Sequence, residues 1–458
     1  MKTLPGIVLI DDKKDDLETI QDSFIRAGYP CFPIHYQNNE PDNPSGIKHV
    51  NLNMIKPRVI ITDLNLQEQQ INPVQLVAPI AEVLKKIAVD GPYILYFWSR
   101  NAGKVREVME LISKRYSDIP YPLDWGVLDK ARFMNQPNEL TESVKELFTK
   151  DPVFHALYSW ENRVATAAQA TTDSLFQLAR PAEKTTLSRF QETTSKKLQT
   201  MLAAIGNETL GVKNAKDEPE VAIELGLEPV LHDHIQSMYE KIDRSVWLKA
   251  ANGIGERLAQ ESYRDVKAQL NSFYHIEELL RDAPKNKRGT WIEADKNYFS
   301  NELYEKKIKN NLGRNIKTLL NEEFLDSSQG TKESRRKAHA ATRLGFIELS
   351  AECDQAQRKT KLNRFFLSAM IPKKYEDFTY FRGGKSDTAH AGVYRLPNVV
   401  VSDEEYIVKI SFMYQVGAIP DSNKWLGDPV FRLKDQILSD ISYKASQHSA
   451  RPGIIRFD

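Results

Sequence analysis

Residues 7–10 form an apolar, β-branched run that ends abruptly in two carboxylates, Asp11 and Asp12. Such a run is typical of a buried strand in a parallel sheet. Open α/β sheets place their functional sites just beyond the C-terminal ends of these strands. Two adjacent acids at that position repel each other unless a cation neutralises them. The pair therefore indicates either a site for a hard metal ion or an exposed acidic turn.

The alternation of short apolar runs and helical spacing continues through residues 1–150. Strands are expected at residues 7–12, 31–36, 57–62, 93–98 and 122–128. Helices are expected between Asp12 and Gly28, near 49–55, and at 74–88, 101–116 and 138–149. This order predicts an α/β fold with a doubly wound, five-stranded parallel sheet that helices cover on both faces.

Polar side chains stand at the ends of four of these strands. Asp11 and Asp12 end the first strand, Asp63 ends the third, Ser99 ends the fourth, and Lys130 follows the fifth. Because the carboxyl ends of parallel strands meet at one edge of a sheet, we expect these side chains to converge. Three carboxylates, a hydroxyl and an ammonium suit phosphoryl transfer, in which acids bind Mg²⁺ and Asp63 attacks a phosphoryl group. The hydroxyl and the ammonium would bind the oxygens of the resulting acyl phosphate.

The order Asp-Asp, then Asp-Leu-Asn-Leu at residues 63–66, then Ser, then Lys resembles the receiver domain of two-component response regulators. The resemblance covers residues 5–150. It implies that Asp63 is the phosphoacceptor and that Asp11, Asp12 and Asp63 bind Mg²⁺, with the main-chain carbonyl of Asn65 as a further ligand. A sensor histidine kinase or a phosphotransfer protein is then the expected partner.

The resemblance also implies that Ser99 and Lys130 contact the phosphate. Three neighbouring positions depart from the family pattern. Arg100 stands where the family has a small residue, and Ala131 follows the lysine where the family has a proline after a cis peptide bond. Val127 and Leu128 occupy the region of the family's aromatic switch residue. We therefore expect the domain to accept phosphate, without the usual aromatic movement.

The remaining two thirds of the chain predict two further domains. Residues 151–335 are expected to be helical, with helices from residue 153 and at 187–202, 228–250, 255–281 and 294–323, and a loop at 206–220. Residues 336–458 are expected to form an α+β domain, with strands at 344–349, 376–381, 391–401, 405–416 and 453–457 and helices at 352–370 and 431–447. A small barrel closed by the last strand is one arrangement of this domain.

Other motifs in this region have ordinary explanations. His232, Asp233 and His234 could serve phosphotransfer or metal-dependent phosphohydrolysis, but a solvated or locally hydrogen-bonded helix is favoured. The turn at residues 383–386 imitates the end of a phosphate-binding loop but lacks its first glycine. The basic run at residues 335–337 is interpreted as a solvated linker.

Composition narrows the classes of function. The net charge of +1 gives no electrostatic reason to expect nucleic acid, and no apolar run is long enough to span a membrane. The two cysteines, Cys31 and Cys353, exclude a disulfide framework and a cysteine-based zinc site. We expect a cytoplasmic protein without a membrane partner.

Three hypotheses follow. In the first, phosphorylation of Asp63 shifts the face made by helix 101–116, strand 122–128 and helix 138–149, and the helical and α+β regions act as an output or partner-binding module. In the second, the receiver is a phosphate sink or scaffold, similar to large receiver proteins beside kinases in bacterial phage-defence operons. In the third, the receiver controls an enzyme in the C-terminal region. This enzyme would act on nucleic acid or nucleotide through Glu348, Cys353, Asp354 or His390. A homodimer is compatible with all three.

Overall fold

The computed structural model contains two compact units, and each unit holds one β-sheet. The first unit comprises residues 1–202 and 224–255, and the second comprises residues 203–223 and 256–458. The structure describes residues 6–37, 46–50, 56–67, 72–88, 91–134, 136–182, 185–238, 242–257, 260–295, 306, 309–310, 313–326, 328–351, 355, 359–380, 392–419 and 425–449.

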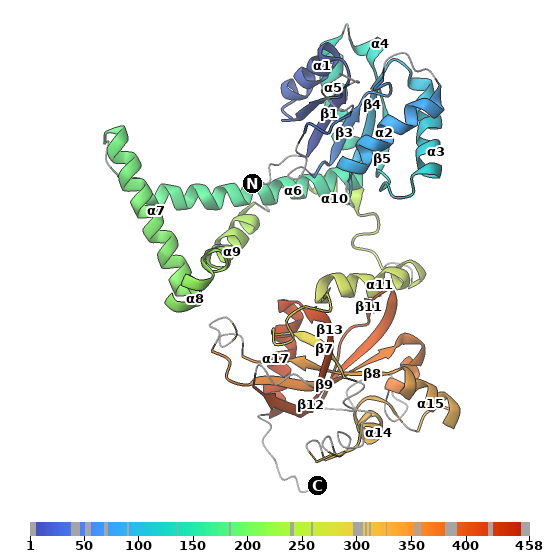
Figure 1. The fold of residues 1–458 in the computed structure, drawn as a ribbon, viewed down its shortest axis with the longest axis vertical. Coiled ribbons are helices and arrows are strands. Elements are labelled where there is room, and N and C mark those ends of the chain that lie inside the picture. The colour runs from blue at the N-terminus through green and yellow to red at the C-terminus, as the bar shows by residue number, and fades with distance from the viewer. Residues whose placement is uncertain are drawn as a thin grey trace. The chain divides into compact units, whose positions relative to one another are not determined.

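The first sheet has five parallel strands in the order β2-β1-β3-β4-β5, which is a receiver-like topology (Figure 1). Its strands are β1 (Ile7–Asp11), β2 (Phe32–His35), β3 (Val59–Thr62), β4 (Ile94–Ser99) and β5 (Asp124–Asp129). This confirms the five-stranded parallel sheet expected from the sequence. Strands β1, β3 and β4 are buried along their whole length, which explains why they read as unbroken apolar runs.

Alternate residues of these strands enter two different cores. Val8 and Ile10 of β1 belong to the core that contains apolar side chains of α2 (Pro73–Ile87) and α3 (Val105–Arg115). Ile7 and Leu9 belong to the core of α1 (Lys14–Arg26) and α5 (Pro137–Lys150). A one-turn helix, α4 (Lys130–Phe133), directly follows β5. Of the helix expected near 49–55, residues 51–55 lie outside the described residues.

Helices continue after residue 150, and the first of them belongs to the first core. The helices are α6 (Pro152–Ala179), α7 (Leu187–Leu210), α8 (Val212–Asp217), α9 (Pro219–Ser237), α10 (Arg244–Ala250) and α11 (Gln260–His275). Phe154 and Tyr158 of α6 are buried in the core of α1 and α5. The carboxylate of Glu161 pairs with Arg58 beside β3 at 2.6 Å. The sheet domain therefore does not end structurally at residue 150.

The prediction of a loop at 206–220 was wrong, because α7, α8 and the start of α9 occupy this segment. Gly206 favoured a loop in the sequence, but it lies within α7. Ala222 and Ile223 of α9 lie close to the position that a side chain of residue 206 would take. The actual break is Gly211, whose φ of +80° is suited to glycine.

The second sheet has eight strands, and all its pairs are antiparallel. The strand order is β10-β12-β9-β8-β7-β13-β6, and β11 pairs with β12. The strands are β6 (Ile276–Glu278), β7 (Thr290–Ala294), β8 (Arg343–Glu348), β9 (Asn363–Pro372), β10 (Val393–Arg395), β11 (Val399–Val401), β12 (Glu404–Ala418) and β13 (Leu426–Leu433). The accompanying helices are α14 (Ile316–Leu319), the π-helical turn η3 (Leu320–Phe324), α15 (Lys332–Ala341), the 3₁₀ segment η4 (Lys373–Thr379) and α17 (Asp435–Ser449).

Several secondary-structure predictions for this half were wrong. The helix expected at 352–370 overlaps β9, a central strand buried at nearly every position, so its sequence lacks the alternation that would reveal a strand. Much of the strand expected at 376–381 is η4. The helix expected at 255–281 ends at His275. Strands β6 and β7 belong to this sheet although they lie within residues 151–335, which were expected to be helical. The final strand expected at 453–457 lies outside the described residues.

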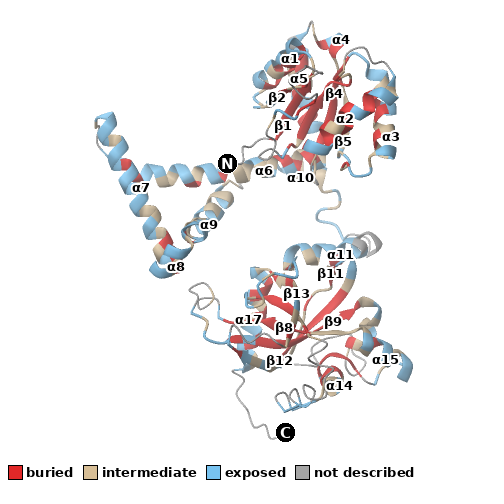
Figure 2. Ribbon diagram, viewed as in Figure 1, coloured by how far each residue is buried: buried red, intermediate tan, exposed pale blue. Residues whose placement is uncertain are grey.

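Burial is concentrated in and around the two sheets, whereas the surfaces of α6 to α9 are largely exposed (Figure 2). In the part of the chain that the structure describes, none of the helices combines the length and the apolar character needed to cross a membrane.

Candidate functional site

The carboxylates at the ends of β1 and β3 lie together. The parallel register aligns Ile10 with Thr62, and the backbone N–H of Asp63 donates to the carbonyl of Ile10 at 2.8 Å. This register places Asp63 beside the end of β1. One oxygen from each of Asp11, Asp12 and Asp63 lies within 4.8 Å of the others. Strand pairing thus brings together residues that are about 50 positions apart in the sequence.

Lys130 lies at the centre of this cluster, and its side chain is only 3 % exposed. Its ammonium is 2.6 Å from Asp11 Oδ2, 3.0 Å from Asp16 Oδ2 and 3.2 Å from Asp63 Oδ2. The backbone places Lys130 there because β5 ends at Asp129, which accepts the Ala131 N–H at 2.8 Å and begins α4.

Asp16 is a member of the cluster that the sequence analysis did not identify. It is buried in the first turn of α1, where an acid is ordinarily explained by the helix dipole. Asp12 precedes α1, so the i,i+4 spacing within a helix does not relate the two acids, and no signal in the sequence placed Asp16 in the cluster. We call Asp11, Asp12, Asp16, Asp63 and Lys130 the carboxylate cluster.

The carboxylate cluster contains four acids and one ammonium, and the ammonium pairs with three of these acids. Burial raises the pKa of Asp11 to about 6, against the attraction of Lys130. Burial likewise raises the pKa of Asp63 to about 6. Burial raises the pKa of Asp12, and the charge of Asp63 raises it further. Burial alone would lower the pKa of Lys130, but Asp63 and Asp11 outweigh it and raise that pKa.

The donor set fits a hard divalent cation. Asp12 Oδ1 is buried with no hydrogen-bond partner among the described residues, and oxygens of Asp11 and Asp63 lie within 4.8 Å of an Asp12 oxygen. Carboxylate oxygens are the ligands that Mg²⁺ and Ca²⁺ prefer. The loop that presents Asp12 is fixed from two sides. Asp11 Oδ1 accepts the Lys13 N–H at 2.9 Å, and His35 Nε2 lies 3.0 Å from the Asp12 carbonyl.

Ser99 and Asn65 lie at the same edge of the sheet but differ in their contacts. Ser99 ends β4, is 1 % exposed, and accepts a hydrogen bond from the Asn101 N–H at 3.2 Å. Among the described residues, no hydrogen bond joins Ser99 to the carboxylate cluster. The backbone N–H of Asn65 donates to Asp63 and lowers its pKa, while Asn65 Oδ1 is buried and has no partner in the part of the chain that the structure describes. Arg100 is exposed.

Those of the other candidate residues that the structure describes do not assemble into a second centre. His232 lies 2.8 Å from Gln236 Nε2 and His234 Nδ1 lies 2.9 Å from Thr171 Oγ1, which is local hydrogen bonding. Within the described ranges, the carboxylates of Asp11, Asp12 and Asp63 are the one group able to hold a metal ion. Glu348 is buried, and the remaining candidates, Cys353, Asp354, His390 and residues 383–386, lie outside the described residues.

The structure also describes the basic run at residues 335–337 and Cys31. The basic run at 335–337 is part of α15 and not a linker, and Lys337 pairs with Glu333 at 2.8 Å. Cys31 is a half-buried free cysteine, and burial raises the pKa of its thiol to about 11, which disfavours the reactive thiolate.

Comparison of the sequence with models of protein families gave no match, and comparison with curated proteins also gave none.

Proposed function

We propose that the first sheet domain is a receiver that accepts a phosphoryl group on Asp63 from a histidine kinase or a phosphotransfer protein. The observation that carries this proposal is the carboxylate cluster, in which one buried lysine touches three acids at the C-terminal edge of a five-stranded parallel sheet. A receiver needs this combination: acids that hold a cation, a carboxylate that attacks, and a cation that binds the transferred group.

The proposed reaction is an in-line displacement. A carboxylate oxygen of Asp63 forms a bond to phosphorus while the phosphorus–nitrogen bond of the donor's phosphohistidine breaks, and the imidazole keeps the electron pair. Mg²⁺ held by Asp11, Asp12 and Asp63, with the Asn65 carbonyl as a further ligand, would neutralise the phosphoryl oxygens. Lys130 would then exchange a carboxylate partner for a phosphoryl oxygen, and the Ser99 hydroxyl would donate to another.

The test is phosphorylation of the full chain by acetyl phosphate and Mg²⁺. We expect a mass gain of one phosphoryl group that hydroxylamine removes, because acyl phosphates react with this nucleophile. Asp63→Ala should abolish the gain, whereas Asp15→Asn, which alters an exposed acid in the same helix turn as Asp16, should retain it. No gain in the wild-type chain, with acetyl phosphate and with a cognate kinase, would contradict the proposal.

The second candidate is a phosphate sink or scaffold. It is favoured by the end of β5, where Val127 and Leu128 stand in the region of the usual aromatic switch residue and neither has an aromatic ring. Leu128 is buried in the core of α1 and α5, and Val127 is half-buried. Both candidates share the phosphorylation chemistry and differ in whether the rest of the chain responds to it.

A further inference from the structure

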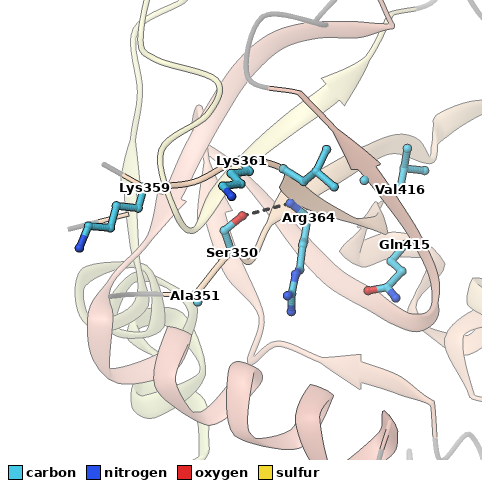
Figure 3. A pocket seen from close by; sticks show the side chains of 9 residues that line it. Ser350, Ala351, Lys359, Lys361, Arg364, Gln415 and Val416 are labelled. Atoms are coloured by element: carbon cyan, nitrogen blue, oxygen red, sulfur yellow. Dashed lines mark hydrogen bonds between the residues drawn. The ribbon is translucent and has the colours of Figure 1, made fainter. Parts of the chain in front are cut away.

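A cavity of about 890 Å³ lies beside the second sheet, in the other compact unit from the carboxylate cluster. Its walls come from the residues after β8, from the start of β9 and from the end of β12. Figure 3 shows Lys361 and Arg364 near the start of β9, with Gln415 on the opposing strand β12. The antiparallel register that pairs Gly417 with Arg364 brings these strands together.

The lining of this cavity is positively charged. Lys359, Lys361 and Arg364 contribute to it, and no carboxylate occurs among the described lining residues. The side chains of Lys361 and Arg364 are exposed, and neither makes an ion pair within the described part of the chain. Other arginines of the same sheet do form ion pairs. Arg343 and Arg432, for example, pair with glutamates at 2.9 and 3.1 Å.

The wall of the cavity is held by buried and partly buried hydrogen bonds. Ser350 donates to the carboxylate of Glu348 and accepts the backbone N–H of Arg364 at 3.1 Å. Arg288 Nε donates to the carbonyl of Ser350 at 3.0 Å. Glu348 is fully buried behind this wall and does not line the cavity. Burial raises the pKa of Glu348, while hydrogen bonds from Ser350 and from the Arg364 N–H act in the opposite direction.

We propose that this cavity binds a small ligand that carries adjacent phosphate groups, of the nucleoside polyphosphate class. Its volume falls within the range of small-molecule sites, about 300–1,000 Å³. Arginine and lysine are the side chains that bind phosphate oxygens, and the apolar Val416 and Leu362 offer a surface for an uncharged ring. This proposal is independent of phosphorylation at Asp63.

The experiment is calorimetric titration of the full chain with ATP and, separately, with inorganic tripolyphosphate, in EDTA and low salt. Removal of divalent cations excludes binding through a metal ion held by the carboxylate cluster, and the variants below locate the binding. We expect saturable binding that weakens at high salt. The Lys361→Glu, Arg364→Glu double variant should bind at least ten-fold more weakly. Tighter binding of ATP than of tripolyphosphate would show that the nucleoside contributes, and equal binding would assign recognition to the phosphates.

Arg336→Glu is the matched control, since Arg336 is an exposed residue of α15, which precedes the opposite end of β8. It should bind both ligands as the wild type does, and circular dichroism should show equal folding of all variants. Absence of binding to both ligands would overturn the proposal, as would equal binding by the double variant. Binding of a short single-stranded oligonucleotide in place of ATP and tripolyphosphate would also overturn it, in favour of a nucleic-acid surface.

Discussion

Lys130 balances part of the negative charge of the carboxylate cluster. Its ammonium approaches Asp11, Asp16 and Asp63 within 3.2 Å and is almost fully buried. Burying a charge is unfavourable unless opposite charges surround it, and the same holds for the acids. In the proposed receiver reaction, a divalent ion or a phosphoryl group would change the charge balance of this cluster directly.

Removal of the Lys130 ammonium should destabilise the domain strongly when metal is absent. We expect Lys130→Met to lower the free energy of unfolding by about 3–5 kcal/mol in EDTA, since it leaves several buried carboxylates without a counter-ion. Mg²⁺ should restore part of this loss. Urea unfolding of the full chain checks the prediction, with Lys14→Met, at an exposed site, as the control. A loss no larger than that of Lys14→Met would contradict it.

The excess of acids also predicts an unusual dependence of stability on pH. Asp63 and Asp11 have folded-state pKa values of about 6, above the ordinary value of 3.8. Stability from these groups is present below pH 3.8 and is lost as the pH rises through 6. Asp63→Asn, which removes one charge, should therefore stabilise the metal-free chain at pH 7.5 by about 1–3 kcal/mol.

At pH 4 this difference should nearly vanish, because the wild-type carboxyl is then mostly protonated. Calorimetric unfolding in EDTA at both pH values provides the measurement. Asp15→Asn should show no gain at either pH. A variant Asp63→Asn that is less stable than wild type at pH 7.5 would show that the cluster's charges are already balanced.

At the scale of elements, helix α6 extends the first core beyond the sheet domain. Phe154 and Tyr158 stack with a centroid distance of 5.6 Å, and Tyr158 packs on Phe148 of α5 at 5.3 Å. Two hydrogen bonds from Arg58 Nε and one from Arg58 Nη2 to Glu161, of 2.6–3.1 Å, add a bidentate contact. The beginning of α6 is thus fixed to the domain that carries the candidate phosphorylation site.

Truncation of Phe154 should detach the start of α6. We expect Phe154→Ala to lower the free energy of unfolding by about 3–5 kcal/mol, because it leaves a cavity in the aromatic core. Val153→Ala, at an exposed neighbouring position, should cost less than about 0.5 kcal/mol. Hydrogen exchange of residues 152–162 in both variants would measure the detachment. Unchanged exchange in Phe154→Ala would mean that α6 is held by other contacts.

At the scale of the whole molecule, α6 is a route by which phosphorylation could reach the helical region. Trp98 of β4, Leu128 of β5 and Phe133 of α4 belong to the same core as Phe154 and Tyr158. Trp98 precedes Ser99 directly, and Leu128 and Phe133 lie two and three positions from Lys130. The Lys130 ammonium lies 5.9 Å from the Trp98 ring. In the proposed reaction, a movement of Lys130 toward a phosphoryl group would act on a core that α6 shares.

For a signalling output, phosphorylation should change hydrogen exchange beyond residue 150, first in α6. A switch from 1:99 to 99:1 requires a preference of about 5.5 kcal/mol for one arrangement, which exchange protection would readily detect. The comparison is the full chain with and without acetyl phosphate, beside Asp63→Ala. Protection changes confined to residues 5–150 would instead support the phosphate sink.

The sequence by itself determined the parallel sheet and the convergence of Asp11, Asp12, Asp63, Ser99 and Lys130 at its edge. These follow from local signals, because short apolar runs define the strands and a polar residue marks each strand end. Apolar runs and polar strand ends were weaker signals in the sequence of the second unit. Strand β9 is buried on both faces and carries no alternating pattern, so it was mistaken for a helix.

Tertiary structure alone decided the contacts that no strand-end pattern marks in the sequence. The contact of Asp16 with Lys130 joins residues 114 positions apart, and that of Arg58 with Glu161 joins residues 103 apart. The cationic cavity likewise depends on the pairing of β9 with β12. Contacts, burial and the pKa values that burial produces are properties of packing between distant segments, and hydrophobic periodicity within one segment carries no information about them.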